Sequence, residues 1–110
     1  MNRGEIWTVT GGAYVTKPRL AVIIQDDLFD ATSSVTVAPM SSTLLNATLM
    51  RIRIAAGDGR SSGLDHDSDV MIDKLTTVKR SNVHARVGRL AAEQVVEVER
   101  AIMAFLGLAR

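Results

Sequence analysis

The chain has 110 residues, a length that predicts a single domain over residues 1–110, and its 46% hydrophobic and 23% charged residues exclude a disordered protein. No apolar run approaches the ~20 residues of a membrane-spanning helix, and the first residues lack the apolar stretch of a secretory signal. The absence of cysteine excludes disulfides and thiolate metal sites and favours a reducing, cytoplasmic location, while a net charge of +1 does not by itself indicate a nucleic-acid-binding protein.

The first part of the chain predicts short strands separated by turns. Residues 4–10, "GEIWTVT", alternate in polarity and predict a strand, and the glycines and proline of residues 11–18 predict a loop. Residues 19–25, "RLAVIIQ", form a mostly apolar run that predicts an inner strand. A helical turn is expected within residues 26–34, followed by a strand over residues 35–41, "VTVAPMS".

Extended segments continue through the middle of the chain. Residues 47–56 alternate again, with two arginines on one face and apolar residues on the other. Residues 57–63, "GDGRSSG", predict a turn-rich loop, and residues 67–73 and 75–80 predict two further short strands.

The end of the chain, residues 91–108, predicts an amphipathic helix. Its apolar side chains recur at spacings of three and four, at Val95, Val98, Ile102 and Phe105. Gly107 is a suitable stop signal for the helix. Several short strands followed by one long helix predict a mainly β fold, a strongly bent sheet or small barrel with the helix laid against it.

Two segments each carry part of a binding motif but lack a residue that the motif requires. "DHDSD" places acidic residues at alternate positions around His66, but the glycine that a calcium loop needs at its sixth position would fall on Val70. The glycines of "GDGRSSG" lack the lysine of a phosphate-binding loop. We therefore expect no metal site and no nucleotide-binding loop.

Side chains that could carry chemistry remain at the strand ends. Ser41, Ser42, His66 and His84 would suffice for a serine–histidine pair, but nothing around them resembles a nucleophile elbow. Arg19 and Ser41 each sit where a strand meets a loop. A guanidinium can donate two parallel hydrogen bonds to phosphate oxygens and a hydroxyl can donate a third, so this pair suits a phosphate ligand.

The order of several segments resembles the MazF/PemK family of bacterial toxins. These segments are "RGEIW", a glycine loop, "RLAVIIQDD", "VAPMSS", "GLDHDSDVMIDKLTTVKRSNV", "VGRL" and a closing helix, and together they run from Arg3 to about Leu108. The resemblance implies a CcdB/PemK-like SH3-like barrel of antiparallel strands with a C-terminal helix, assembled as a homodimer. It also implies a metal-independent, cofactor-free endoribonuclease that cuts single-stranded RNA at short sequences and leaves a 2′,3′-cyclic phosphate and a 5′-hydroxyl.

Further consequences of the resemblance concern biology and partners. Cleavage of messenger, transfer or ribosomal RNA would inhibit translation and growth. A cognate antitoxin, usually a flexible acidic segment, would neutralise the toxin by covering the groove that RNA uses, and a cationic rim suits both ligands.

The family's catalytic residues map onto named positions of this chain. The family's arginine falls on Arg19, aligned backwards from "IQDD", and its threonine falls on Ser41 of "PMSS", which keeps the hydroxyl. The family usually has proline after the arginine, whereas here Pro18 precedes Arg19, so Lys17 is the candidate in the alternative register. Arginine is a poor general base near neutral pH, so we assign it charge stabilisation, with proton donation to the leaving oxygen as a second role to consider, and keep His66 as a candidate base.

Other residues are candidates for binding RNA or the antitoxin without taking part in chemistry. The first loop lacks the family's common Glu-Gln pair and offers Tyr14, Thr16 and Lys17 instead. Tyr14 could stack on a base, and a set of cations could follow the phosphate backbone: Lys17, Arg51, Arg53, Lys74, Lys79 and Arg80. Trp7 and Phe105 are assigned to the core, and His84 to a structural role.

Two alternatives keep the fold and change the function. A CcdB-like toxin would poison DNA gyrase through its C-terminal helix, although the end of this chain, "AFLGLAR", is mostly apolar. A non-catalytic RNA-binding module would bind RNA without cutting it.

Overall fold

The computed structural model describes residues 1–11, 14–57 and 61–108, and for residues 14–16 it describes the backbone only. The described residues form seven strands and one α-helix: β1 (Glu5–Gly11), β2 (Tyr14–Ile23), β3 (Ser34–Ser41), β4 (Arg51–Ile54), β5 (Ser68–Met71), β6 (Thr76–Lys79), β7 (Val83–Arg89) and α1 (Ala92–Phe105). Three 3₁₀ turns join them: η1 (Asp27–Phe29), η2 (Ile72–Lys74) and η3 (Arg80–Asn82).

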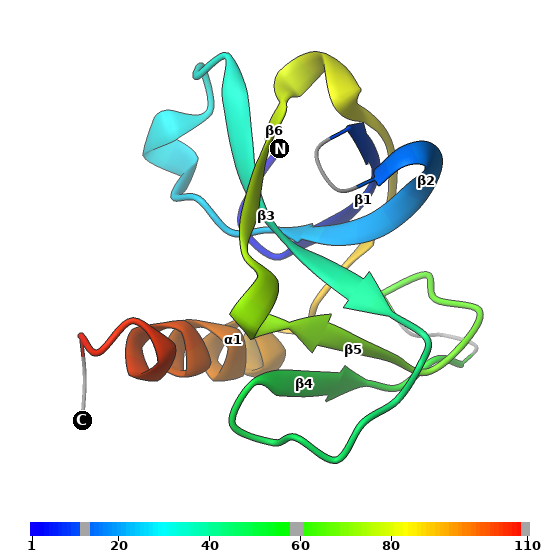
Figure 1. Ribbon diagram of the computed structural model, residues 1–110, viewed down its shortest axis with the longest axis vertical. Helices are drawn as coiled ribbons and strands as arrows, with labels where there is room; N and C mark the ends of the chain where they lie inside the picture. Colours follow the sequence, from blue (N-terminus) through cyan, green and yellow to red (C-terminus); the bar gives the residue numbers. More distant parts are fainter. Residues whose placement is uncertain (12–13, 58–60, 109–110) are drawn as a thin grey trace.

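The strands pair in the order β4-β5-β3-β2-β1-β7, with β6 also paired to β3, and every pair is antiparallel (Figure 1). β3 pairs with β6 along its first half, with β2 at Val37–Pro39 and with β5 at Met40 and Ser41. This division of one strand among three partners bends the sheet strongly. The expected mainly β fold with a bent sheet and a C-terminal helix is confirmed.

Two apolar clusters lie on opposite faces of β2. Val22 belongs to the cluster that α1 covers through Val98, whereas Ala21 and Ile23 belong to the second cluster. Because successive side chains of a strand point to opposite faces, a strand buried on both faces must be apolar at consecutive positions. This arrangement explains the continuous apolar run that begins at Leu20.

The helix is confirmed, and its ends follow from the local sequence. The Gln94 Oε1 atom accepts a hydrogen bond from the Ala91 N–H at 2.8 Å, which satisfies one exposed donor at the N-terminus. At the other end Gly107 has φ of +73°, and the Leu108 N–H reaches the Met103 carbonyl at 2.8 Å. A residue without Cβ adopts this left-handed conformation readily, so Gly107 ends the helix as predicted.

Three expectations of local structure were wrong. The loop expected over residues 11–18 is mostly strand, because β2 begins at Tyr14, and a register shift between Val9 and Gly11 takes up the irregularity of the hairpin. β7 was not predicted, although it pairs with β1 at the edge of the sheet. Phe105 is 47% exposed on the last turn of α1 instead of buried in the core.

Trp7 packs against the second apolar cluster, as expected for a core residue. Among the described residues, no helix is long and apolar enough to cross a membrane.

Candidate active site

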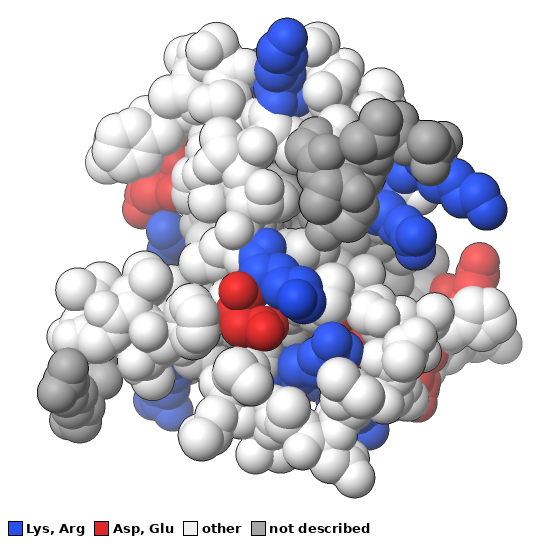
Figure 2. All heavy atoms as spheres, viewed as in Figure 1, with Lys and Arg blue, Asp and Glu red and all other residues white. Residues whose placement is uncertain are grey.

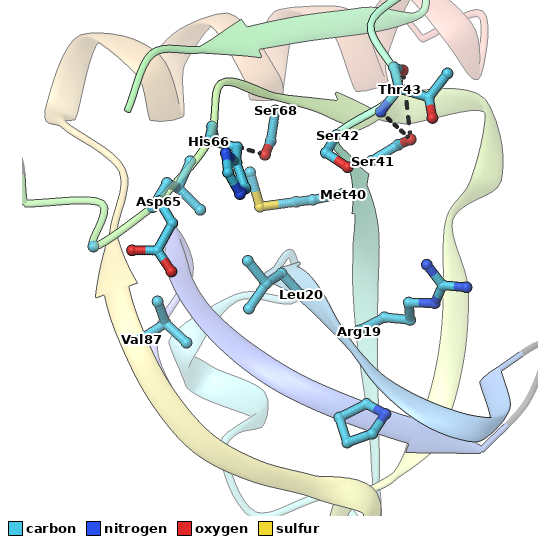
Figure 3. A pocket seen from close by; sticks show the side chains of 13 residues that line it. Arg19, Leu20, Met40, Ser41, Ser42, Thr43, Asp65, His66, Ser68 and Val87 are labelled. Carbon is cyan, nitrogen blue, oxygen red and sulfur yellow. Dashed lines mark hydrogen bonds between the residues drawn. The ribbon is translucent and has the colours of Figure 1, made fainter. Parts of the chain in front are cut away.

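A pocket of about 400 Å³ lies where the first half of β2 faces the end of β3. Figure 3 shows Arg19 on one side, Asp65 and His66 on the other, and Leu20 and Met40 between them. The pocket therefore combines an apolar floor with charged and polar walls, a composition typical of ligand sites.

Arg19 lies in the part of β2 that pairs with β1 but not with β3. The strand pairs with β3 only from Ala21 to Ile23, so Arg19 lies beyond the paired segment, with Val9 of β1 opposite it. Its side chain is exposed, and it forms no ion pair with any residue in the described part of the chain. In Figure 3 the guanidinium extends from β2 on the same side of the pocket as Ser41 and Thr43. A cation with this exposure is available for an anionic ligand.

Ser41 is the last residue of β3, and its hydroxyl is oriented by the turn that follows. The Oγ atom accepts a hydrogen bond from the Thr43 N–H at 3.1 Å. The hydroxyl lies 3.4 Å from the Thr43 carbonyl oxygen, near the outer limit for an O–H donor. One lone pair is therefore committed, while the proton is held weakly and can turn to a ligand in the pocket.

His66 and Asp65 come from the segment between Leu64 and β5. Leu64 is buried in the core, and the Ser68 hydroxyl donates to the His66 carbonyl at 3.0 Å. These two contacts hold the backbone of the segment, whereas both side chains are exposed at the pocket. His66 thus lines the same pocket as Arg19 and Ser41, while Lys17 does not line it.

A buried carboxylate lies immediately behind the Ser41 side of the pocket. Asp69 is 1% exposed, and its Oδ1 atom accepts from Arg53 Nε at 2.8 Å while Oδ2 accepts from the Leu45 N–H at 3.0 Å. Arg51 Nη1 lies 3.4 Å from Oδ2. Burial alone would raise the pKa of the Asp69 carboxyl, but the hydrogen bonds from Arg53 and Leu45 and the charge of Arg53 outweigh it and lower that pKa.

The other predicted cations are not brought together at the pocket. Arg51 and Arg53 line a separate hollow and are bound to Asp69. Arg80 is held by the Thr32 carbonyl at 2.7 Å, and Lys74 and Lys79 are exposed on η2 and β6. Figure 2 shows Lys and Arg side chains spread over one face of the molecule, with acidic side chains beside some of them.

The side chains of Tyr14 and Thr16, predicted to bind RNA or the antitoxin, lie outside the described residues. His84 is hydrogen-bonded through Nε2 to Thr10 Oγ1 at 2.8 Å, between β7 and β1, which agrees with the structural role assigned to it.

The pairing of Asp69 with Arg51 and Arg53 was missed because Asp69 was considered only as the last residue of the "DHDSD" motif. A signal was present in the alternation of Arg51 and Arg53, which places two cations on one face of a short strand. Two like charges so close to each other are stabilised by an acidic partner on a neighbouring strand.

Comparison with known proteins identifies related chains. Residues 2–106 match a family model described as a PemK-like, MazF-like toxin of type II toxin–antitoxin systems. A protein of Mycolicibacterium smegmatis, described as a probable endoribonuclease MazF, is 51% identical over 110 residues, which cover 99% of each chain.

Solved structures show the same fold at lower identity. The Mycobacterium tuberculosis toxin MazF-mt6 superposes with a TM-score of 0.81 at 22% identity, covering 96% of this chain and 99% of that one. An endoribonuclease in complex with its cognate antitoxin, from a mycobacterial species, has a TM-score of 0.79 at 15% identity and covers 100% and 98%. A MazE–MazF structure from Deinococcus radiodurans has a TM-score of 0.74 at 13% identity and covers 99% and 97%.

The lowered pKa of Asp69 predicts a pH-dependent contribution to stability. A carboxyl whose pKa is lowered by folding stabilises the fold fully above its ordinary pKa of about 3.8, and this contribution is lost as pH falls from there through the lower pKa of the folded state. We expect Asp69→Asn to reduce the free energy of unfolding by about 1.5–3 kcal/mol at pH 7, the size of hydrogen bonds to a charged group. The difference from wild type should narrow at about pH 3. Urea unfolding at both pH values measures it, and an equal difference at both would contradict this assignment.

Proposed function

Since the chain belongs to the PemK-like, MazF-like toxins of type II toxin–antitoxin systems, we propose that it is an endoribonuclease that cuts RNA in the pocket between β2 and β3. The observation that carries this proposal is that Arg19 and Ser41, far apart in sequence, line one pocket together with His66. A cation, a hydroxyl donor and an imidazole around one cavity are suited to a phosphodiester.

In the proposed reaction the ribose 2′-hydroxyl attacks the adjacent phosphorus. The O2′–P bond forms, the P–O5′ bond breaks, and the leaving O5′ takes a proton from Arg19 or from solvent, so that the products carry a 2′,3′-cyclic phosphate and a 5′-hydroxyl. Negative charge builds on the non-bridging oxygens in the transition state. Arg19 donates to these oxygens, and the weakly held Ser41 proton turns from the Thr43 carbonyl to the same group. Donors oriented before the reaction contribute roughly 3–4 kcal/mol each in comparable sites.

His66 is proposed as the base that takes the proton of the 2′-hydroxyl. An imidazole exchanges protons near neutral pH, which a guanidinium does not. Figure 3 places His66 across the pocket from Arg19, so a ribose over Leu20 and Met40 would lie between base and cation. The group that accepts the proton, His66, and the group that stabilises the charge, Arg19, would then lie on opposite sides of the bound nucleotide.

The shape of the pocket favours single-stranded RNA and a metal-independent reaction. A hollow of about 400 Å³ accepts one splayed-out nucleotide, whereas the stacked bases of a duplex cannot enter it. The guanidinium of Arg19 supplies the positive charge that a divalent cation supplies in other nucleases.

A cognate antitoxin is the proposed regulatory partner. Arg19 has no carboxylate partner among the described residues, so an acidic segment of the antitoxin could pair with it and exclude RNA from the pocket. Addition of the cognate antitoxin should then stop RNA cleavage, and antitoxin that binds without inhibiting cleavage would contradict this placement.

The role of Arg19 is tested by cleavage of a mixed-sequence RNA in EDTA. We expect the wild type to cut, with cyclic phosphate ends, and Arg19→Ala to be slower by about 10²–10³-fold because a transition-state donor is lost. Lys17→Ala is the matched control, since Lys17 is an exposed cation on the same strand that does not line the pocket. Its rate should change less than tenfold.

The reverse ranking of the two variants would move the catalytic cation to Lys17. Wild-type protein that leaves the mixed-sequence RNA intact in this assay would overturn the proposed activity.

The role of His66 is tested by replacing it. His66→Ala should lower kcat by about 10²–10⁴-fold, the usual contribution of a general base. Single-turnover cleavage of the same RNA by both proteins measures the effect. Full activity of His66→Ala would remove this residue from the mechanism.

A further inference from the structure

The buried carboxylate of Asp69 is the cross-strand neighbour of Ser41. In the pairing of β3 with β5, Ser41 lies directly opposite Asp69 and Met40 lies opposite Val70. The Cα atoms of two opposed residues in an antiparallel pair lie about 4.5–5.5 Å apart, so a substitution at one residue changes the surroundings of the other. Asp69 does not line the pocket itself.

Asp69 also organises the segment that follows Ser41. Its Oδ2 atom accepts from the Leu45 N–H at 3.0 Å, and its two arginine partners reach the same segment. Arg51 Nη1 donates to the Thr43 carbonyl at 3.0 Å, and Arg53 Nη2 donates to the Leu45 carbonyl at 3.1 Å. The carboxylate and both guanidiniums therefore hold residues 43–45 by their backbone groups.

These contacts determine what the Ser41 hydroxyl can do. The Thr43 N–H is directed at Ser41 Oγ only while residues 43–45 keep their position. The Thr43 carbonyl already accepts from Arg51 at 3.0 Å, a shorter contact than its 3.4 Å contact with the Ser41 hydroxyl. The arginine and the serine hydroxyl thus share this carbonyl, and the serine contact is the longer of the two, so the serine proton can turn to a phosphate oxygen while Arg51 keeps the carbonyl paired.

We propose that Asp69, Arg51 and Arg53 form a positioning network that holds the Ser41–Leu45 turn and directs the Ser41 hydroxyl into the pocket. The proposal rests on the proposed ribonuclease function and adds three residues that contact the turn and not the substrate. It also explains why a carboxylate that is 1% exposed lies beside a pocket with which it has no direct contact. A buried charge is costly unless it is paired and hydrogen-bonded. Here each partner of the Asp69 carboxylate either belongs to the turn or donates a hydrogen bond to it.

The test is a double-mutant cycle between Asp69→Asn and Ser41→Ala, measured as kcat and KM on one RNA. Asp69→Asn alone should lower kcat by about 10–100-fold with KM little changed, because a misplaced group affects the transition state most. In the Ser41→Ala background the same substitution should lower kcat by less than about threefold, since the hydroxyl that it positions is already absent. An equal loss in both backgrounds would show that Asp69 supports only the fold and would overturn the proposal.

Two further variants separate positioning from loss of folding. Arg53→Lys keeps the charge but cannot bridge Asp69 and the Leu45 carbonyl as a guanidinium does, so it should reproduce the Ser41-dependent loss in a folded protein. Glu5→Gln is the matched control, because Glu5 is another buried carboxylate, hydrogen-bonded to Trp7 in β1 and absent from the pocket lining. Its kcat should equal that of the wild type once the folded fraction is accounted for.

Amide hydrogen exchange provides a readout that does not depend on ribonuclease activity. Asp69→Asn should speed exchange of the Thr43 and Leu45 N–H groups at least tenfold more than it speeds exchange of the core amides of β2, whose protection falls only with the global stability. Protection of both groups at the wild-type level would overturn the positioning network. If the wild-type protein cuts no RNA, the proposed function is overturned, and so is a catalytic role for the network. Faster exchange of these two groups in Asp69→Asn would still show, in that case, that the network holds the turn.

Discussion

The division of β3 among three partner strands is the constraint on which the site depends. Its first half pairs with β6, residues 37–39 pair with β2 on the opposite edge, and its last two residues pair with β5, so β3 belongs to both parts of the bent sheet. The bend leaves the early part of β2 unpaired with β3, and Arg19 lies there, while Ser41 ends β3 and the segment before β5 carries His66. One topological feature thus brings a cation, a hydroxyl and an imidazole to the same hollow.

A second constraint is the charge of Asp69, which is buried at the point where β3 meets β5. Its pairing with Arg51 and Arg53 ties β4 to β5, and the same arginines hold the turn after Ser41. A buried ion pair is not by itself a strong source of stability, because desolvation offsets much of the attraction. Such a pair is better understood as a means of specifying geometry, here the geometry of a turn next to the proposed scissile phosphate.

Features that depend on local periodicity could be predicted from the sequence, and features that depend on partners could not. The apolar run after Arg19 predicted an inner strand, and the spacing of Val95 and Val98 predicted the helix, because burial imposes those periods directly. The start of β2 was missed because glycine and proline usually mark loops. Here Gly11 lies at the irregular end of the pairing between β1 and β2, and Pro18 lies within β2. The pairing of Asp69 with two arginines was missed because it joins strands whose register no single segment reveals. Arg19 and Ser41 were chosen for their chemistry and for an expected position at strand ends. The structure places Ser41 at the end of β3 but Arg19 within β2, and it places both at one pocket.

We propose that the pocket formed by β2 and β3 directs a ribose 2′-hydroxyl at the neighbouring phosphate. This is tested with a short RNA that the protein cuts at one position, beside a matched RNA with a 2′-deoxyribose at the nucleotide 5′ to that bond. We expect the all-ribose strand to be cut to a cyclic phosphate and a 5′-hydroxyl, and the deoxy strand to stay intact at that bond. Cutting of the deoxy strand at the same bond would show that an external nucleophile attacks the phosphate, not the ribose 2′-hydroxyl.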